Sequence, residues 1–184
     1  MNTKLPEYSP MESAVLHKAA ERFTFPLTAE DVKNINTLEA KYDAEENCAG
    51  LAGPQIGFGK AAIIFAVKDD PDLKKFRKDL VDTMPKTMWL NPSYEPIGQD
   101  MLEDWEGCFS VPDVAGLVKR YTKIRYTFFD KTGKKITGIA TGFLARVIQH
   151  ETDHINGILF TEKAIKTMPL DEYRAMRKKV MEKQ

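Results

Sequence analysis

The feature of this sequence that most constrains its fold and chemistry is a pair of histidines four positions apart, His150 and His154. Residues 141–156 are predicted to form a helix, and side chains four residues apart project from one face of a helix. Two neutral imidazoles placed in this way can bind one metal ion. Glu151 then lies where it can act as general base toward a water molecule. The HExxH pattern therefore favours a hydrolytic metal site over a solvated helix that carries these residues by chance.

Composition favours one globular enzyme-sized domain over residues 1–184. The chain has a mass of 20.9 kDa, 42% hydrophobic and 29% charged residues, and a formal net charge of zero, which excludes a strongly basic nucleic-acid-binding protein. No apolar run approaches the ~20 residues that a membrane span needs. The N-terminal segment has no apolar signal region, and its acidic residues argue against a transit peptide. Two cysteines form no disulfide framework, so we expect a reducing, cytoplasmic location.

The N-terminal part of the chain is predicted to be helical. Ser9 followed by Pro10 is typical of a helix start, and we expect this helix to run to about Phe23. A second helix begins near Thr28, with Asp31 at capping-box spacing. Its predicted apolar face carries Val32, Ile35, Leu38 and Tyr42.

The middle of the chain is predicted to form short strands. We expect them at residues 61–67, 87–90 (ending at Asn91-Pro92), 114–118, 124–129 and 135–140, with a hairpin turn at 130–133. Residues 68–86 are charged and interrupted by prolines, which indicates a surface insertion with one short helix. A last helix is predicted over residues 170–183, and Gly157 is predicted to cap the helix before it. The expected fold is α+β, with small antiparallel or mixed sheets around the HExxH helix, helices before them and a C-terminal helix after them.

A catalytic metal site of this kind needs a third protein ligand. Downstream of His154 only glutamates remain, and Glu172 is the one at a plausible distance. Upstream, Cys108 stands in the segment EGCFS, and a thiolate is a strong ligand. Cys108 has two further interpretations, a buried small apolar side chain and a nucleophile activated by His150. The residues by themselves leave these alternatives open.

The segment from residue 48 to 57 combines glycines with one glutamine. The glycines at positions 50, 53 and 57 predict an irregular loop that lets backbone come close to another group. Gln55 offers an amide donor that can hold a developing oxyanion. Such a loop is more often a plain turn, and it lacks the Gly-Lys-Ser/Thr of a phosphate-binding loop.

These segments, in this order, resemble the peptide deformylase family. The three motifs are GLAGPQIG at 50–57, EGCFS at 106–110 and QHETDHING at 149–157. The resemblance extends to Val111-Pro112 and Arg120 and covers about residues 48–162. The chain departs from the usual family pattern at four positions, which are Cys48, Gly53, Phe109 and Asp113. All chemical groups are retained, so the departures bear on the shape of the pocket. Cys48 also raises the hypothesis of an oxidative cross-link to Cys108, against the simpler interpretation of a buried thiol.

The resemblance implies a metal-dependent hydrolase of protein biosynthesis that removes the N-formyl group from the formyl-methionine of nascent polypeptides and releases formate. One divalent metal ion is implied, Fe²⁺ in the cell with Zn²⁺ or Ni²⁺ also able to bind, held by Cys108, His150 and His154. A metal-activated water attacks the formyl carbon, with Glu151 as general base and then acid. Gln55 and the backbone N–H of Phe109 are implied to stabilise the oxyanion.

The resemblance also implies how the peptide is bound. The peptide is expected to lie strand-like against Ala49, Gly50 and Gly107. Its methionine side chain is expected to enter a pocket lined by Phe143, Arg146 and Val147.

Other interpretations stay open from the sequence. The first is a metalloprotease built on HExxH, with a downstream third ligand. The second is a catalytically silent deformylase-like binding protein, and the third is a metal-free Cys–His hydrolase. No DNA or membrane partner is expected, and a bacterial source is favoured over an organellar or phage one. The last helix carries basic side chains that are either a solvated face or a dock onto ribosomal RNA, namely Arg174, Arg177, Lys178, Lys179 and Lys183.

Overall fold

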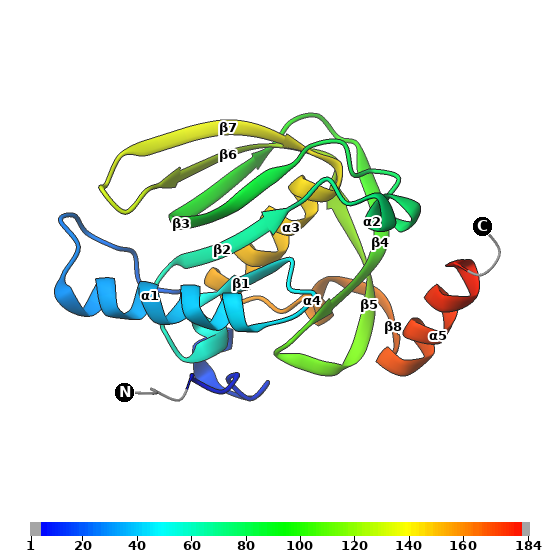
Figure 1. Cartoon of the computed structure of the whole chain (residues 1–184), viewed down its shortest axis with the longest axis horizontal. Coiled ribbons are helices and arrows are strands. Elements are labelled where there is room, and N and C mark those ends of the chain that lie inside the picture. The colour runs from blue at the N-terminus through cyan, green and yellow to red at the C-terminus, as the bar shows by residue number, and fades with distance from the viewer. Residues whose placement is uncertain (1–4, 182–184) are drawn as a thin grey trace.

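The computed structural model describes residues 5–181 and has two antiparallel sheets on either side of a buried helix (Figure 1). The five-stranded sheet has the order β1-β2-β3-β6-β7 and the three-stranded sheet the order β4-β5-β8. The strands are β1 (Gly50–Ala52), β2 (Ala62–Val67), β3 (Met84–Pro96), β4 (Met101–Cys108), β5 (Val111–Tyr121), β6 (Lys123–Phe129), β7 (Lys135–Thr141) and β8 (Ala164–Pro169). Every pairing between named strands is antiparallel, and the predicted α+β class is confirmed.

The helix that carries HExxH, α3 (Gly142–Ile155), contacts strands of both sheets. Twelve of its residues are buried, which explains why its side chains can face a site from the inside of the molecule. Gly157 follows it with a φ of 75°, and a Cβ there would come within 2.7 Å of the Lys18 backbone nitrogen. The predicted glycine cap is therefore confirmed, and no other residue type fits this position without strain.

The other helices lie around this centre. They are α1 (Ala29–Ala44), α2 (Pro71–Phe76), α4 (Phe160–Lys163) and α5 (Leu170–Met181), together with 3₁₀ turns at Ala14–His17 and Gly53–Ile56. The Thr28 capping box is present, since the Asp31 backbone nitrogen donates to Thr28 Oγ1 at 3.1 Å and Thr28 nitrogen donates to Asp31 Oδ2 at 3.0 Å. The short helix predicted within 68–86 is α2. The predicted C-terminal helix is confirmed as far as Met181, and its last two expected residues lie outside the described range.

The largest part of the core packs the five-stranded sheet against α3. Trp89 on β3 is fully buried, stacks on Phe128 with ring centroids 4.1 Å apart and meets the edge of Phe65 at 4.8 Å. Leu144 and Ile148 of α3 belong to the same cluster. These apolar contacts fix the position of α3 against the sheet, and therefore the position of the two histidines that it carries. No helix within residues 5–181 is long and apolar enough to cross a membrane.

The predicted helix from Ser9 to Phe23 is wrong. Only Ala14–His17 form a single 3₁₀ turn, and the rest of the segment contains no helix. Its polar groups are bonded to distant elements, since Ser9 Oγ donates to the Pro54 carbonyl at 3.0 Å and Ala20 nitrogen donates to the Ile155 carbonyl at 2.8 Å. These tertiary bonds replace the ones that a helix would have made locally.

The predicted end of a strand at Asn91 is also wrong, because β3 continues to Pro96. Asn91 adopts a φ of 50°, and the pairing with β6 shifts register between Leu90 and Ser93. The Asn91 side chain forms two hydrogen bonds with the backbone of Phe23. It accepts from the Phe23 N–H at 2.8 Å and donates to the Phe23 carbonyl at 3.0 Å. The strand thus passes through a bulge that this amide stabilises. β4, β8 and α4 were not predicted.

Candidate active site

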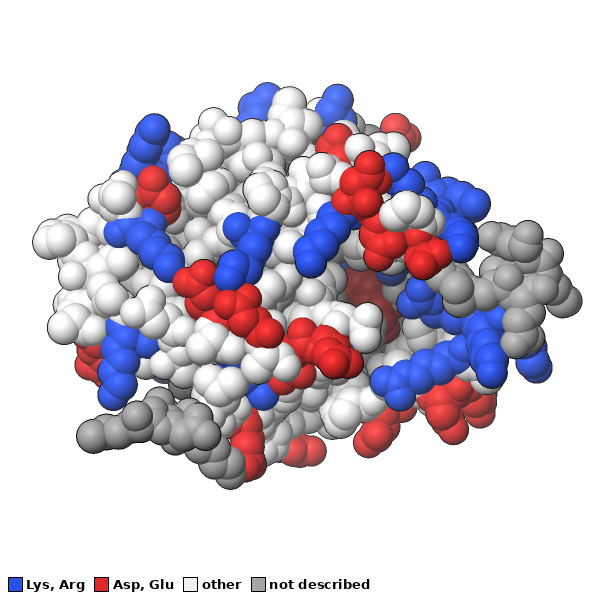
Figure 2. Space-filling model, viewed as in Figure 1, with Lys and Arg blue, Asp and Glu red and all other residues white. Residues whose placement is uncertain are grey.

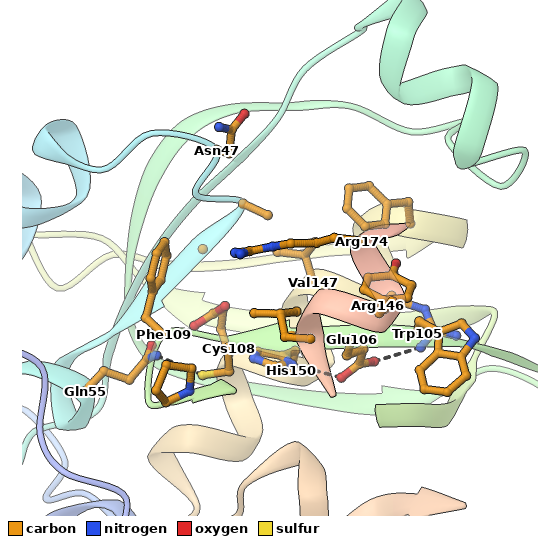
Figure 3. Close-up of a pocket in the computed structure, with 18 of the residues that line it drawn as sticks. Asn47, Gln55, Trp105, Glu106, Cys108, Phe109, Arg146, Val147, His150 and Arg174 are labelled. Atoms are coloured by element: carbon orange, nitrogen blue, oxygen red, sulfur yellow. Dashed lines mark hydrogen bonds and ion pairs between the residues drawn. The ribbon is translucent and has the colours of Figure 1, made fainter. Parts of the chain in front are cut away.

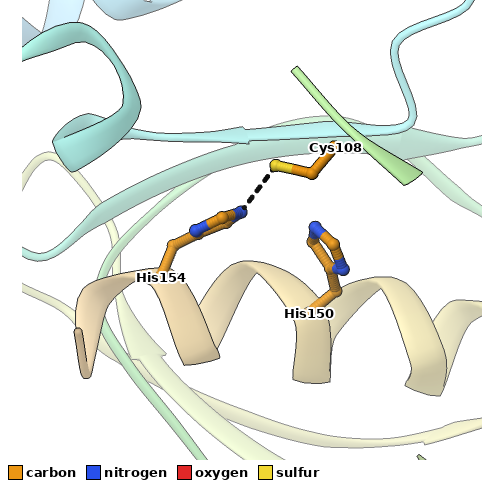
Figure 4. A group of neighbouring side chains, drawn as sticks. All are labelled: Cys108, His150 and His154. Atoms are coloured by element: carbon orange, nitrogen blue, oxygen red, sulfur yellow. Dashed lines mark hydrogen bonds between the residues drawn. The ribbon is translucent and has the colours of Figure 1, made fainter. Parts of the chain in front are cut away.

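Three side chains from two distant parts of the chain meet at the centre of the molecule (Figure 4). Cys108 is the last residue of β4, and His150 and His154 lie one turn apart on α3. Their ligand atoms all lie within 4.8 Å of one another, and Cys108 Sγ is 3.3 Å from His154 Nε2. A sulfur and a nitrogen bound to one tetrahedral zinc ion are about 3.5 Å apart. The donor set and its spacing therefore fit a divalent metal ion.

One carboxylate fixes the orientation of His150. Glu106 Oε2 lies 2.9 Å from His150 Nδ1, which leaves Nε2 as the nitrogen available to a ligand. Burial by itself would raise the pKa of Glu106, but the hydrogen bonds from Arg120 and His150 outweigh it and hold the pKa well below its usual range. Glu106 is therefore ionised, and Nδ1 is the donor in this bond.

Glu106 is itself held by buried charges. Arg120 donates to both of its oxygens, from Nε at 2.9 Å and from Nη2 at 2.8 Å, and Arg146 Nη1 donates to Oε1 at 2.7 Å. Arg120 Nη1 also pairs with Asp153 of the HExxH helix, whose other oxygen accepts from Lys163 Nζ at 2.6 Å. We call Glu106, Arg120, Arg146 and Asp153 the buried charge network. Sequence reasoning included Glu106 and Arg120 among the motif matches but assigned them no role.

Glu151 lies on α3 against strand β1. Its side chain is buried, and its Oε2 has no hydrogen-bond partner among the described residues. Burial raises its pKa to about 7, and a cation bound nearby would lower it. A Cβ at Gly50 would lie 2.6 Å from Glu151 Oε1, so the glycine gives this carboxylate its room. The base candidate thus lies beside the strand that carries the glycine-rich motif.

Gln55 is directed at Cys108, as expected for an amide donor. Residues 48–57 are more regular than predicted, with β1 followed by the 3₁₀ turn that contains Gln55. Its Oε1 accepts from Ala52 nitrogen at 2.8 Å. This bond orients Nε2, which donates to Cys108 Sγ at 3.2 Å and to Ser110 Oγ at 3.3 Å. Phe109 lies next to them, with its ring stacked on Tyr8 at 5.0 Å.

One cavity of about 660 Å³ is lined by Gln55, Glu106, Cys108, Phe109, His150 and Glu151 (Figure 3). His154, Arg120 and Asp153 are not part of its lining. The predicted peptide-contacting residues line the same cavity, and they are Ala49, Gly50, Gly107, Phe143, Arg146 and Val147. Two of them differ from simple expectation. The Arg146 guanidinium is occupied, since besides Glu106 it donates to the Leu102 carbonyl at 2.6 Å and the Val118 carbonyl at 3.1 Å. A Cβ at Gly107 would meet nothing closer than Leu170 Cδ1 at 3.8 Å, so packing does not require glycine there.

Sequence reasoning missed one whole wall of the cavity. It is formed by side chains of β4, of α5 and of the residue that directly follows α2, which are Trp105, Leu170, Tyr173, Arg174, Arg177 and Arg77. No motif in the sequence signals this wall, because it exists only once β8 has carried α5 to the mouth of the cavity. Glu172, the downstream alternative for a third ligand, is exposed on α5 and is not part of the three-residue group.

Comparison with known proteins gives consistent matches. The profile of the polypeptide deformylase family matches residues 8–169. A curated relative, "Peptide deformylase 2" from Rickettsia conorii, is 52% identical over 193 aligned positions that span all of this chain and 96% of the relative. The structure of a class I type b peptide deformylase from Acinetobacter baumannii, bound to Met-Ala-Ser, superposes with a TM-score of 0.76 at 27% identity and covers 88% of this chain and 99% of that one. A Synechococcus elongatus peptide deformylase in complex with actinonin gives 0.69 at 31% identity, over 88% and 82%.

Proposed function

This chain belongs to the peptide deformylase family, hydrolases that remove N-formyl groups, and we propose that its reaction takes place where Gln55, Cys108 and Glu151 face the cavity. The proposed substrate is the formyl-methionyl end of a nascent polypeptide. The observation that carries the proposal is the 3.3 Å approach of Cys108 Sγ to His154 Nε2 in a cavity that Glu151 and Gln55 also line.

The proposed metal ligands are Cys108, His150 and His154, with Fe²⁺ as the ion in the cell and Zn²⁺ or Ni²⁺ as substitutes. When bound, a divalent cation polarises the substrate carbonyl and makes water a nucleophile near neutral pH. A cysteine with two imidazoles suits all three ions.

The remaining steps belong to the chain's own residues. Glu151 takes a proton from the attacking water as its oxygen bonds to the formyl carbon. Gln55 Nε2 and the backbone N–H of Phe109 donate to the charge that develops on the formyl oxygen. The carbon–nitrogen bond then breaks, Glu151 returns the proton to the leaving amine, and formate and a free amino terminus remain.

Substrate binding uses the two walls beside these groups. The peptide backbone is proposed to lie along Ala49, Gly50 and Gly107 in the manner of an added strand. The methionine side chain is proposed to enter between Phe143, Arg146 and Val147. Because Glu106 neutralises Arg146, this part of the cavity presents no unpaired charge to a thioether.

The alternatives are less well supported. A metalloprotease with a downstream ligand does not fit a group completed by Cys108, which lies upstream of the helix. A silent binding protein does not explain why Gln55 and Glu151 line the same cavity as Cys108. The metal content of the active enzyme distinguishes a metal-free Cys–His hydrolase from the proposed metal-dependent one.

The test is formate release from formyl-Met-Ala-Ser, with metal content measured on the same sample. We expect Cys108→Ser to lose metal and activity, and Glu151→Gln to keep the metal while losing turnover by about 10³-fold or more. Cys48→Ser is the matched control and keeps both, since Cys48 lies outside the ligand group. A metal-loaded wild-type enzyme that releases no formate, or that cuts internal peptide bonds, would overturn the proposal.

Two further parts of this proposal concern location and partner. The bacterial relatives and the nature of the substrate favour action on nascent chains in the cytoplasm. Ribosome docking would fall to Lys178 and Lys179, which are exposed and do not line the cavity, whereas Arg174 and Arg177 do line it. Loss of salt-sensitive ribosome co-sedimentation in the double Lys178→Gln, Lys179→Gln variant tests this part.

A further inference from the structure

The geometry points to Arg174 as a specificity residue that binds a carboxylate of the formyl-peptide substrate downstream of its first residue. This inference rests on the proposed function and deepens it. It gives the enzyme a preference among formyl peptides, for those with an acidic side chain at the second or third position or a free C-terminal carboxylate close by.

The first observation is the position of Arg174. The residue lies on α5 and lines the cavity, and Figure 3 shows its side chain reaching from the helix over Val147 toward the middle of the cavity. In Figure 2, Lys and Arg side chains gather over α5 beside the hollowed part of this face. A peptide leaving the reaction centre through this opening passes within reach of a positive group.

The second observation is the state of the charges that line the cavity. Arg146 is bonded to Glu106, and Arg77 forms an ion pair with Asp104 and donates to the Trp105 carbonyl at 3.2 Å. Arg174 is different, because within residues 5–181 no carboxylate pairs with it. In contrast to Arg146 and Arg77, Arg174 therefore has N–H donors that are available to a ligand.

The third observation is that α5 is held in place. Tyr173 packs against Trp105 of β4 with ring centroids 5.7 Å apart, and Leu170 lies near Gly107. β8, which leads directly into α5, pairs with β5 over residues Ala164–Pro169. The backbone from which the Arg174 side chain extends is thus held in place by packing. This reduces the conformational entropy that is lost when the side chain binds a ligand.

A second charged residue of the cavity lining sets the direction of the preference. Glu46, which is exposed, lines the cavity from the segment before β1. An acidic side chain is repelled by Glu46 and attracted by Arg174, whose planar guanidinium can bind both carboxylate oxygens. The family profile ends at residue 169, one residue before α5 begins, so this contact lies outside the segment that defines the family.

The test measures formate release from matched formyl peptides that differ in one charge. The pairs are formyl-Met-Asp-Ala-amide with formyl-Met-Asn-Ala-amide, formyl-Met-Ala-Asp-amide with formyl-Met-Ala-Asn-amide, and formyl-Met-Ala-Ala as free acid with its amide. We expect a kcat/KM about tenfold higher for the charged member of at least one pair, and the pair that shows it identifies the source of the carboxylate. The preference should weaken as salt rises, because Arg174 is exposed.

Three variants assign the preference to its residue. Arg174→Gln should remove it while leaving the neutral peptides within about twofold, and Arg174→Lys should keep part of it. Lys178→Gln, on the same helix but outside the cavity lining, should keep all of it. Equal rates within every pair in the wild type, or a preference that survives in Arg174→Gln, would overturn the inference. Neutral peptides serve as the reference throughout, since absence of formate from all of them contradicts the proposed function itself.

Discussion

The buried charge network reaches the cavity through Glu106 and Arg146, and Arg174 on α5 borders the same cavity, but the two are held in opposite ways. Glu106 and Arg120 are 6% and 2% exposed, and each has several charged partners. Arg174 is exposed and has no such partner within the described residues. The difference indicates a division of labour, in which charges that fix the reacting groups are paired and removed from water, while the charge that meets the substrate stays available.

The largest effect is expected from breaking the network. Arg120→Met leaves Glu106 and Asp153 with fewer buried partners, and removing one member of a buried ion pair costs about 3–5 kcal/mol. We expect the midpoint of thermal unfolding to fall by about 10 °C. Arg125→Met, at an exposed arginine on β6, is the control and should change stability by no more than about 0.5 kcal/mol. Equal midpoints for the two variants would show that the network does not stabilise the fold.

The next largest effect is expected from steric crowding of Glu151. Gly50→Ala places a Cβ 2.6 Å from Glu151 Oε1, so the carboxylate must move. Displacement of a reacting group by about 1 Å costs up to about 100-fold in rate, so formate release should fall by about 10- to 100-fold while metal content stays unchanged. Gly59→Ala, where the nearest atom is Val15 Cγ2 at 3.7 Å, is the matched control. An unchanged rate in Gly50→Ala would mean that Glu151 tolerates the shift.

A smaller effect is expected at the anchor of α5. Tyr173→Ala removes the ring that packs on Trp105, a contact worth about 1 kcal/mol. Amide hydrogen exchange should rise over residues 170–181 and stay unchanged in α3, which separates the two regions directly. Glu172→Ala, exposed on the same helix, controls for the change in helix composition. Faster exchange in α3 as well would contradict the separation.

The smallest effect is a pH dependence far from the cavity. The hydrogen bond from Lys60 outweighs the burial of Asp31 and lowers its pKa, so the folded state releases this proton more readily than the unfolded chain. The resulting stability is present above the unfolded pKa of about 3.9 and is lost as pH falls through the folded value. Asp31→Asn should therefore unfold at a slightly lower temperature at pH 7 and lose less stability on acidification. Thermal midpoints measured from about pH 7 to about pH 3 check this, and parallel curves would contradict it.

The sequence was most informative where local pattern and final structure agree. The Thr28 capping box and the glycine after α3 depend on residues close in the chain, and both were predicted correctly. Ser9 shows the opposite case, because its hydroxyl donates to the carbonyl of Pro54, forty-five residues away. β4 escaped prediction since charged side chains such as Glu103 and Asp104 interrupt its apolar pattern and face outward or into ion pairs.

The same reasoning applies to the site. The HExxH spacing placed His150 and His154 on one helix face from local geometry alone, while the meeting with Cys108 came from a family resemblance and not from any spacing. The roles of Glu106 and Arg120 as supports were out of reach, because both depend on which buried atoms face each other across two strands. The wall formed by α5 depends on β8, a strand of six residues whose exposed side chains give no clear strand pattern.

β5 is the shared centre of its sheet, with β4 on one side and β8 on the other. A chain that ended before Ala164 would leave one side of β5 with unpaired backbone donors and acceptors along the register that now runs from Val114 to Val118. Such an open edge is a template for intermolecular strand addition and aggregation. β8 itself forms the outer edge of this sheet, and it is a strand of six residues that carries Lys166 and ends at Pro169, two features that discourage the addition of a further strand.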